Sequence, residues 1–351
     1  MLTSLSNTTL DKIAACIKEH DRFAVCGHVN PDGDCLGSQL ALVAGLRALG
    51  KQATGLLATP QPIEQKLCFL PGSDELVPAA EFTEDIEVFI AVDVPNLDRL
   101  KDAAAVHDRA PVCITIDHHA SDTSMAQLNY VDPDAAAACD LIWELLKILG
   151  CIDAEQALCV LTGIMTDTGR FSYQNTDPTC LIHAAETVEA GAEPNVVARE
   201  FFQSRSLASL RLEQVVLERM MFFCDGQFVF SYLKDSDFDR IGAIRDDAEI
   251  LIDVLRGIAG VRVALILKEN GEGVIRGSLR AKDDTDVAQV ARFFGGGGHR
   301  AAAGLTFRGS LFEACAAVPS KVFEDCFAQE APAATQRLRE LLSEQRVELD
   351  G

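Results

Sequence analysis

The sequence predicts an α/β fold: a mainly parallel sheet of about five strands with helices on both faces, joined by helices to a smaller α+β domain with a mixed sheet. Two observations carry this prediction. Over the first 190 residues, β-branched and apolar runs alternate with helix-like segments, as in parallel sheets covered on both faces. Beyond residue 226, strand-like runs lie close together with turn signals between them, as in antiparallel pairs.

The elements of the first half follow from their apolar patterns. Residues 22–28 (RFAVCGH) are typical of a buried strand, and residues 35–49 of an apolar helix that ends at Gly50. Residues 86–94 and 112–117 are two further β-branched runs, each with a carboxylate near its end. Helices are expected over 137–149, 154–165 and 178–191. Because ligands of such sheets bind at the carboxyl ends of the strands, the residues at those ends are the first candidates for a site.

The second half predicts a strand over 227–233, a helix over 246–257, a strand pair within 261–281, a short helix over 286–294 and a strand that runs through Phe307. Four segments are therefore expected: a first domain over 1–190, a helical linker over 191–225, a second domain over 226–330 and a charged helical tail over 331–351.

Composition limits the classes of function. Hydrophobic residues make up 48% of the 351 residues, with no apolar run long enough to span a bilayer and no signal-peptide pattern at the start, so we expect a cytoplasmic protein without a membrane partner. The twelve cysteines include no C-x-x-C pair, which favours free thiols over disulfides or structural zinc. The net charge of −22 argues against binding of long nucleic acid and favours a small anionic substrate. The sequence leaves a homodimer open.

The segment from His28 to Asp34 (HVNPDGD) is the first candidate for metal binding. It places an imidazole and two carboxylates within seven residues, between a strand and a helix. Such crowded carboxylates repel one another unless a cation lies between them. A helix-capping aspartate and a loop histidine explain this segment alone about equally well.

Three further segments place polar groups at the same edge of the sheet. Asp93 closes an apolar strand, Asp117 precedes the pair His118 and His119, and Asp167 follows an apolar helix in a glycine-flanked turn. Together the segments predict a metal centre whose ligands are His28, Asp32, Asp34, Asp93, His118 and Asp167. Oxygen and imidazole ligands without a thiolate favour Mn²⁺, with Mg²⁺, Fe²⁺ or Co²⁺ as alternatives. Six ligands suit two ions about 3.5–4 Å apart.

These motifs, with Gly37-Ser38 and Asp167-Thr-Gly, resemble the four motifs of the DHH phosphoesterases. The run from Gly295 to Gly304 (GGGGHRAAAG) resembles the signature of the DHH-associated domain. The compact pairing is most similar to the nanoRNase branch, which hydrolyses short oligoribonucleotides to mononucleotides or 3′-phosphoadenosine 5′-phosphate to AMP.

The resemblance also implies roles for the residues. His28, Asp32 and Asp93 hold one ion, Asp93 bridges to the second, and His119 faces the substrate phosphate, so that Asp93 and His119 are the catalytic pair. The ligands of the second ion are Asp34, Asp93, His118 and Asp167. One departure is Ala301–Ala303, where relatives often carry a polar residue, which bears on selectivity for the nucleotide end.

The second domain is expected to hold the substrate. Between Arg256 and Arg308 the chain has nine Lys or Arg residues against five acids, and such a basic region attracts small anions. A glycine run lets backbone N–H groups approach a phosphate, and arginines bind phosphate through two hydrogen bonds. The predicted substrate-binding residues are Arg280, Gly295, Gly296, Gly297, Gly298, His299 and Arg300. Asp283 or Asp286 could instead pair with either arginine of this set.

Four other functions are alternatives to this one. The first is a phosphodiesterase of linear or cyclic dinucleotides, which fusion to sensory or membrane segments would favour. Exonuclease action on long strands is disfavoured by the acidity, and an inorganic pyrophosphatase by the glycine–histidine run. The rival from another class is a non-catalytic nucleotide-binding regulator, which we expect to have lost at least one metal ligand.

Overall fold

The structure is a computed structural model that describes residues 3–120 and 124–349. Contacts divide the chain into two compact units, Met1–Ser204 and Arg205–Gly351. Across the described ranges, no helix combines the length and the apolar character needed to cross a membrane. All twelve cysteines are free, and most are buried.

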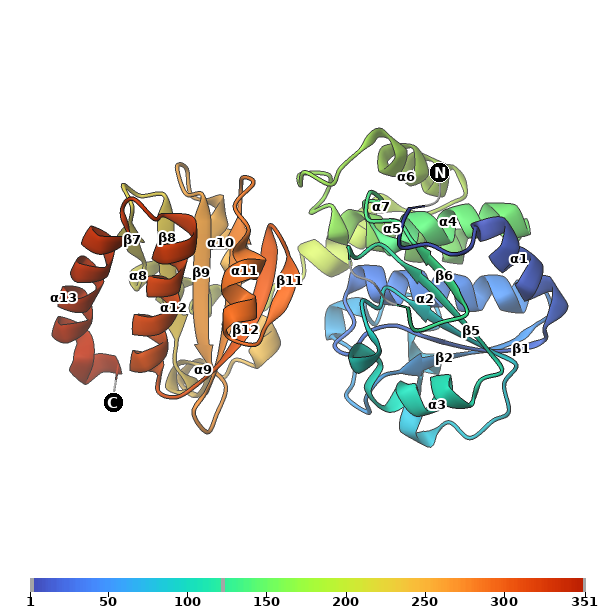
Figure 1. Ribbon diagram of the computed structural model, residues 1–351, viewed down its shortest axis with the longest axis horizontal. Coiled ribbons are helices and arrows are strands. Elements are labelled where there is room, and N and C mark those ends of the chain that lie inside the picture. Colours follow the sequence, from blue (N-terminus) through green and yellow to red (C-terminus); the bar gives the residue numbers. More distant parts are fainter. Residues whose placement is uncertain (1–2, 121–123, 350–351) are drawn as a thin grey trace. The chain divides into compact units, whose positions relative to one another are not determined.

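The first unit is built on a six-stranded parallel sheet with the order β3-β2-β1-β4-β5-β6 (Figure 1). Its strands are β1 (Arg22–Cys26), β2 (Gln52–Leu57), β3 (Val77–Pro78), β4 (Val88–Val92), β5 (Val112–Asp117) and β6 (Leu128–Val131). Strand order reverses between β1 and β4, which pair directly. In sheets of this order, the ligand crevice lies at that reversal, beyond the carboxyl ends of the strands.

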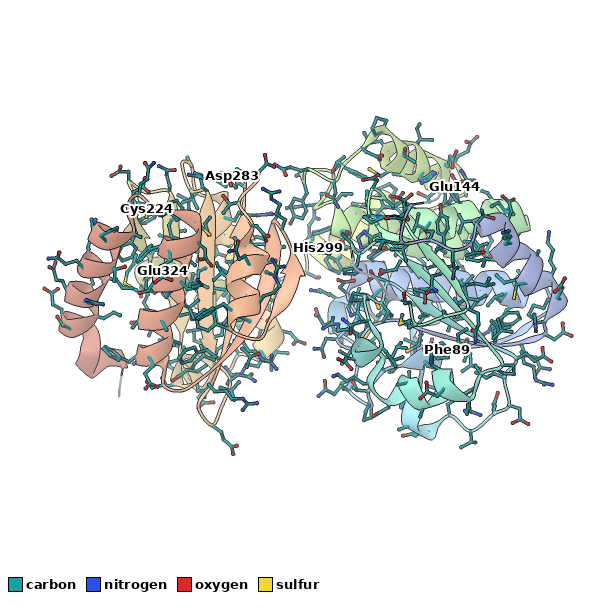
Figure 2. All side chains as sticks on the ribbon, in the orientation of Figure 1. Phe89, Glu144, Cys224, Asp283, His299 and Glu324 are labelled. Atoms are coloured by element: carbon teal, nitrogen blue, oxygen red, sulfur yellow. The ribbon has the colours of Figure 1, made fainter. Side chains whose placement is uncertain are left out.

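Helices cover both faces of this sheet. One face packs against α1 (Leu10–Glu19), α2 (Gly33–Ala48), α4 (Ala138–Leu149) and α5 (Ala154–Asp167). The other packs against α3 (Ala104–Arg109) and the 3₁₀ segments η3 (Ala79–Glu81) and η4 (Leu97–Ala103). Phe89 of β4, labelled in Figure 2, lies in this second core. Its ring meets that of His107 edge to face, with the ring centroids 5.5 Å apart. The predicted α/β class is confirmed.

Helix α2 is buried around nearly its whole circumference, because it lies between the sheet and α5. Close packing of α2 on α5 depends on small residues: a Cβ at Gly37 would lie 2.4 Å from the carbonyl oxygen of Cys159. Helix α5 continues through Asp167, so Asp167 is the last residue of a helix, not a turn residue as the sequence predicted. Helix α6 (Pro178–Glu189), α7 (Pro194–Val197) and the π-helix η5 (Ala198–Phe202) complete this unit.

The second unit contains a six-stranded mixed sheet with the order β11-β12-β10-β9-β8-β7. Only β8 and β9 are parallel; the other neighbours are antiparallel. Its strands are β7 (Met221–Phe223), β8 (Phe228–Leu233), β9 (Val263–Glu269), β10 (Val274–Ala281), β11 (Gly297–His299) and β12 (Ala302–Arg308). The predicted mixed sheet is therefore confirmed, while β7 lies in the segment that the sequence predicted to be a helical linker.

Two cores flank this second sheet. One contains α11 (Val287–Phe293), α12 (Leu311–Cys326) and α13 (Ala331–Leu349), and α13 contributes the buried Leu338 and Leu342. The other contains α8 (Leu207–Glu218), α9 (Asp235–Ile241), η6 (Arg245–Ala248) and α10 (Leu251–Gly257), packed on β8 and β9. Among the described buried residues, this second core includes none from β12, so that face of β12 is left to solvent.

Candidate metal centre

The ends of β1 and β4 bring the first group of predicted ligands together. His28 lies two residues beyond β1, and Asp93 directly follows β4. Nε2 of His28 is 3.4 Å from Oδ2 of Asp93 and 3.9 Å from Oδ2 of Asp32. Nδ1 of His28 lies 2.9 Å from the carbonyl oxygen of Val29. In the tautomer whose Nδ1–H donates to this carbonyl oxygen, Nε2 carries a lone pair that faces the carboxylates, as in metal-binding histidines.

His118, directly after β5, joins the second group. Its Nε2 is 3.5 Å from Oδ1 of Asp93, 3.7 Å from Oδ2 of Asp34 and 3.8 Å from Oδ2 of Asp167. The two oxygens of Asp93 therefore face different histidines, Oδ2 toward His28 and Oδ1 toward His118. All six predicted ligands lie in one cluster, and Asp93 occupies the position between its two halves.

Asp32 and Asp34 are held by helix termini. Asp32 is the N-cap of α2, and its Oδ1 accepts hydrogen bonds from the backbone N–H groups of Asp34 and Cys35. The carboxylate of Asp34 accepts the N–H groups of Ala138 and Cys139 at 2.7 and 2.9 Å, at the start of α4. A carboxylate is stabilised at a helix amino terminus, so Asp34 is fixed by two helices at once.

Asp93 is the residue whose surroundings most clearly require a cation. It is 2% exposed, and its Oδ1 is a buried oxygen without a hydrogen-bond partner in the described part of the chain. Its backbone φ of 56° lies in the left-handed region, which non-glycine residues adopt at a cost and which is common at functional sites. A divalent cation with oxygen and nitrogen ligands fits this cluster, because it would satisfy the unpaired oxygen.

The electrostatics of the cluster favour positive charge. Burial, followed by the charge of Asp93, raises the pKa of Asp34 to about 7. Burial alone lowers the pKa of His118, but the nearby carboxylates of Asp93, Asp167 and Asp34 outweigh it, so this pKa is raised well above its usual range. Buried carboxylates that raise neighbouring pKa values in this way form a strong site for a cation.

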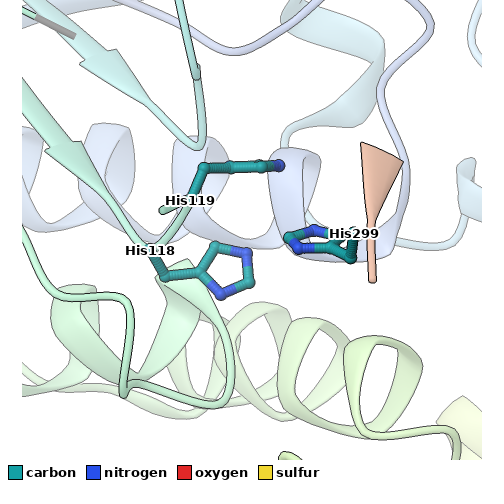
Figure 3. Close-up of side chains that lie close together, drawn as sticks. All are labelled: His118, His119 and His299. Atoms are coloured by element: carbon teal, nitrogen blue, oxygen red, sulfur yellow. The ribbon is translucent and has the colours of Figure 1, made fainter. Parts of the chain in front are cut away.

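His119 is oriented by Asp117. Its Nδ1 lies 2.8 Å from Oδ1 of Asp117 and 3.4 Å from Oδ1 of Asp93. The same Asp117 oxygen accepts the backbone N–H of His118 at 2.9 Å. The rings of His118 and His119 meet edge to face, with centroids 5.0 Å apart (Figure 3). Asp117 thus sets the positions of both histidines.

Arg99 and the side chain of Asp117 also contact the predicted ligands, although neither has a predicted role. Arg99 lies in η4, and its Nη2 is 3.2 Å from Nδ1 of His28. No sequence signal indicates this contact, because 71 residues separate the two. Asp117 could have been found from the sequence, since it adjoins the two histidines that it holds. Cys35 also approaches the cluster: the backbone N–H of His28 donates to its Sγ at 3.2 Å.

In the second unit, strand register brings Arg280 and His299 to one face of the sheet. Both are ladder partners of Ala302, one on each side, so the small Ala302 lies between them. Gly297 and Gly298 belong to strand β11, and a Cβ at Gly298 would lie 2.5 Å from the carbonyl oxygen of Ala302. The glycine run therefore pairs closely with β12 instead of forming an open loop throughout.

The two aspartates predicted as alternative partners of Arg280 and Arg300 form ion pairs with other arginines. Asp283 pairs with Arg262 at 2.6 Å, and Asp286 pairs with Arg292 at 3.3 Å. Arg280 donates to the carbonyl oxygen of its neighbour Leu279. Nε of Arg300 donates to a second carbonyl oxygen, that of Asp284. Neither arginine is held by a carboxylate in the described residues.

Two family models match the chain: "DHH family, N-terminal domain" over residues 22–164 and "DHHA1 domain" over residues 225–329. Several curated relatives carry the name bifunctional oligoribonuclease and PAP phosphatase NrnA. The one from Thermus thermophilus is 32% identical over 286 residues, which are 81% of this chain and 84% of the relative. The one from Bacillus subtilis is 26% identical over 295 residues, 83% and 90% of the two chains.

A solved structure is also similar over nearly its whole length. An exopolyphosphatase-related protein from Bacteroides fragilis has a TM-score of 0.82 and 26% identity, covering 95% of this chain and 97% of that one. The RecJ exonuclease of Thermus thermophilus, with a TM-score of 0.51 and 15% identity, shares the fold. The matched models, the identity to the Thermus relative and the shared fold show that this chain belongs to the DHH family, with a DHHA1 domain in its second unit.

Proposed function

We propose that this chain is a two-metal phosphoesterase that hydrolyses short oligoribonucleotides to mononucleotides and 3′-phosphoadenosine 5′-phosphate to AMP. The observation that carries the proposal is the cluster of His28, Asp32, Asp34, Asp93, His118 and Asp167, in which a buried oxygen of Asp93 has no hydrogen-bond partner among the described residues. The substrates are those in the names of the Thermus and Bacillus relatives.

The proposed ligand sets divide the cluster in two. His28, Asp32 and Asp93 would hold one divalent ion. Asp93 would also bind the second ion, whose ligands are Asp34, Asp93, His118 and Asp167. Two such ions supply Lewis-acid stabilisation of a phosphoryl group and acidify water. The donor set of carboxylate oxygens and imidazoles favours Mn²⁺, and Mg²⁺ or Co²⁺ also suit it.

The chain's own residues supply orientation and proton handling. Because Nδ1 of His119 is committed to Asp117, a contact between His119 and a substrate phosphate is made through Nε2. A protonated His119 would neutralise charge on the non-bridging oxygens and could deliver a proton to the departing sugar oxygen. In the second unit, Arg280, the glycine run, His299 and Arg300 would bind the nucleotide end.

The first experiment is hydrolysis by purified protein with Mn²⁺. The substrates are a labelled ribonucleotide dimer, a 24-mer and 3′-phosphoadenosine 5′-phosphate, with Asp93→Ala as the inactive control. Release of mononucleotide from the dimer, slow action on the 24-mer and no reaction by the control would support the proposal. A dimer and a bisphosphate that both stay intact would contradict it.

A dinucleotide phosphodiesterase is the second candidate. A cyclic-di-AMP phosphodiesterase GdpP from Geobacillus thermodenitrificans is 23% identical over 81% of this chain. The match covers only 44% of that relative, so this function ranks second. Cleavage of cyclic di-AMP in the same assay, without action on the ribonucleotide dimer, would favour it.

A further inference from the structure

A cavity of about 710 Å³ lies in the second unit, apart from the predicted substrate-binding arginines. It is bounded by the turn between β9 and β10, by the end of β12 and by the turn after α11. Its lining includes the polar side chains of Asn270, Arg276, Thr306 and Arg308, together with Phe294 and Gly295. Gly295 is the first glycine of the predicted phosphate-binding run, so the cavity adjoins that run.

Strand register places the two arginines of the cavity on the same sheet face as Arg280, while Phe307 of the lining points to the opposite face. Arg276 is the ladder partner of Thr306, and Val274 is the partner of Arg308. Because side chains alternate along a strand, Arg276 and Arg280 of β10 point to one face, and Thr306 and Arg308 of β12 share it. Nη1 of Arg276 donates to Oγ1 of Thr306 at 2.6 Å, which fixes the guanidinium beside the cavity.

The charge of the cavity is wholly positive. No carboxylate lines it, and neither Arg276 nor Arg308 forms an ion pair within residues 3–120 and 124–349. Other arginines of this unit, such as Arg262 and Arg292, are paired with aspartates. In a chain of net charge −22, two unpaired guanidinium groups in one cavity mark a site for an anion.

The surroundings indicate a nucleotide as the source of that anion. The ring of Phe294 packs beside Phe307, with centroids 6.0 Å apart, and is half-buried, so the part of it that lines the cavity offers an apolar surface on which a base can stack. Arg276 lies four residues from Arg280 on the same strand, a separation of about 13 Å. One phosphate cannot bridge that distance, so an anion at Arg276 and Arg308 is a different group from one at Arg280.

We propose that this cavity binds a second phosphate of a nucleotide ligand, held by Arg276 and Arg308, beyond the phosphate that contacts Arg280. The nucleotide identity of the ligand rests on the proposed function. The second phosphate has two sources: the backbone of the same oligonucleotide, or a separate molecule such as AMP or inorganic phosphate. Both present the same oxygens to the arginines.

Binding of a fluorescently labelled ribonucleotide pentamer tests the proposal. The full chain carries Asp93→Ala, and no divalent metal is present, so anisotropy reports binding without turnover. Arg276→Gln and Arg308→Gln should each raise Kd about tenfold and lower the slope of log Kd against log salt by about 0.7. Arg292→Gln, a matched loss of charge at an arginine outside the cavity, should change Kd less than twofold. Variants that equal this control in binding the pentamer, and also in binding AMP and inorganic phosphate, would overturn the proposal.

Substrate length and competitors separate the two sources. If the phosphate belongs to the oligonucleotide, Arg276→Gln raises the Kd of the pentamer much more than the Kd of the dimer. If the phosphate belongs to a separate molecule, AMP or inorganic phosphate binds the unsubstituted cavity, and Arg276→Gln weakens that binding. The Kd values of the dimer and the pentamer then change by the same factor. Both outcomes support a phosphate site. Failure of Mn²⁺-dependent hydrolysis would refute the proposed function alone, because the anisotropy measurement involves no turnover.

Discussion

Oδ1 of Asp117 lies 2.8 Å from Nδ1 of His119. Asp117 is fully buried and is the last residue of β5, so the carboxylate that holds the imidazole is itself fixed by the sheet. Carboxylates in this position fix the tautomer of a histidine and the orientation of its ring. His119 is therefore positioned by the sheet itself, although it lies in the loop beyond β5.

We expect Asp117→Asn to lower kcat about 10–100-fold, because partners of this kind contribute that much to histidine sites. The amide can hydrogen-bond to Nδ1 but cannot stabilise a protonated ring. The measurement is kcat and KM for the ribonucleotide dimer across pH 6–9. A purely structural role would lower the amount of folded protein and leave the shape of the pH profile unchanged. An unchanged kcat would contradict the role given to Asp117.

Asp93→Asn should remove most of the bound metal and lower kcat by about 100–1000-fold. Asparagine tolerates the left-handed backbone that Asp93 adopts, so the fold should survive while the negative charge is lost. Metal content by atomic emission and hydrolysis of the dimer provide the two measurements. Asp98→Asn is the matched control, since Asp98 is exposed on η4; equal metal content in the two variants would argue against the bridging position.

Gly163→Ala should disturb the metal centre through packing. A Cβ at Gly163 would lie 2.1 Å from Sγ of Cys139 and 2.7 Å from Oδ1 of Asp34. We expect a loss of about 1–3 kcal/mol in the free energy of unfolding and weaker metal binding, because Asp34 must move. Denaturant unfolding and metal titration measure these effects.

The control for this prediction is Gly257→Ala at the end of α10, where an added Cβ meets no heavy atom within 4 Å. That substitution should be neutral or stabilising by up to about 1 kcal/mol. If Gly163→Ala binds metal as tightly as the control, crowding of Asp34 by an added Cβ does not affect metal binding, and the prediction is wrong.

His183 of α6 joins two carboxylates of α4. Its Nδ1 is 2.9 Å from Asp140 and its Nε2 is 2.7 Å from Glu144. Only the protonated ring can donate to both. Burial alone lowers the pKa of His183, but the hydrogen bonds to Asp140 and Glu144 outweigh burial and raise it.

A raised pKa in the folded state makes this contribution to stability pH-dependent. It is fully present below the unfolded pKa of about 6.5 and is lost as pH rises through the folded pKa. His183→Gln should therefore lower the free energy of unfolding by about 1–2 kcal/mol at pH 6 and by less at pH 9, measured by urea unfolding. His20→Gln is the control, because the ring of His20 bonds to a carbonyl oxygen. An equal loss at both pH values would exclude a protonated His183.

The elements that the sequence predicted are those with long apolar runs. Strands β1, β4 and β5 and helices α2, α4, α5 and α6 were expected near their observed positions. Strand β2 was not, because its sequence, QATGLL, contains one β-branched residue and a glycine. In the structure, a Cβ at Gly55 would lie 2.7 Å from the side chain of Leu76. The short strands β3, β6 and β7 each span only two to four residues, too few to show a period.

The candidate site was predictable to the extent that its residues follow strands. His28, Asp93 and His118 lie within two residues of strand ends, and parallel strands bring such positions together. The contacts of Arg99 with His28 and of Asp34 with the start of α4 join segments far apart in the sequence. Such contacts depend on loop paths and helix packing, which apolar periodicity does not determine.

The hydrogen bonds from Ala138 and Cys139 to Asp34 bear on how the centre is loaded. They hold this carboxylate through the folded backbone, so its conformation is already restricted before any ion arrives. An ion that enters a preorganised ligand loses little affinity to the ordering of that side chain. The same bonds mean that Asp34 serves two tasks at once. A substitution of Asp34 that removes a metal ligand also removes the acceptor of the first N–H groups of α4. Such a substitution is therefore expected to weaken both metal binding and the stability of the fold.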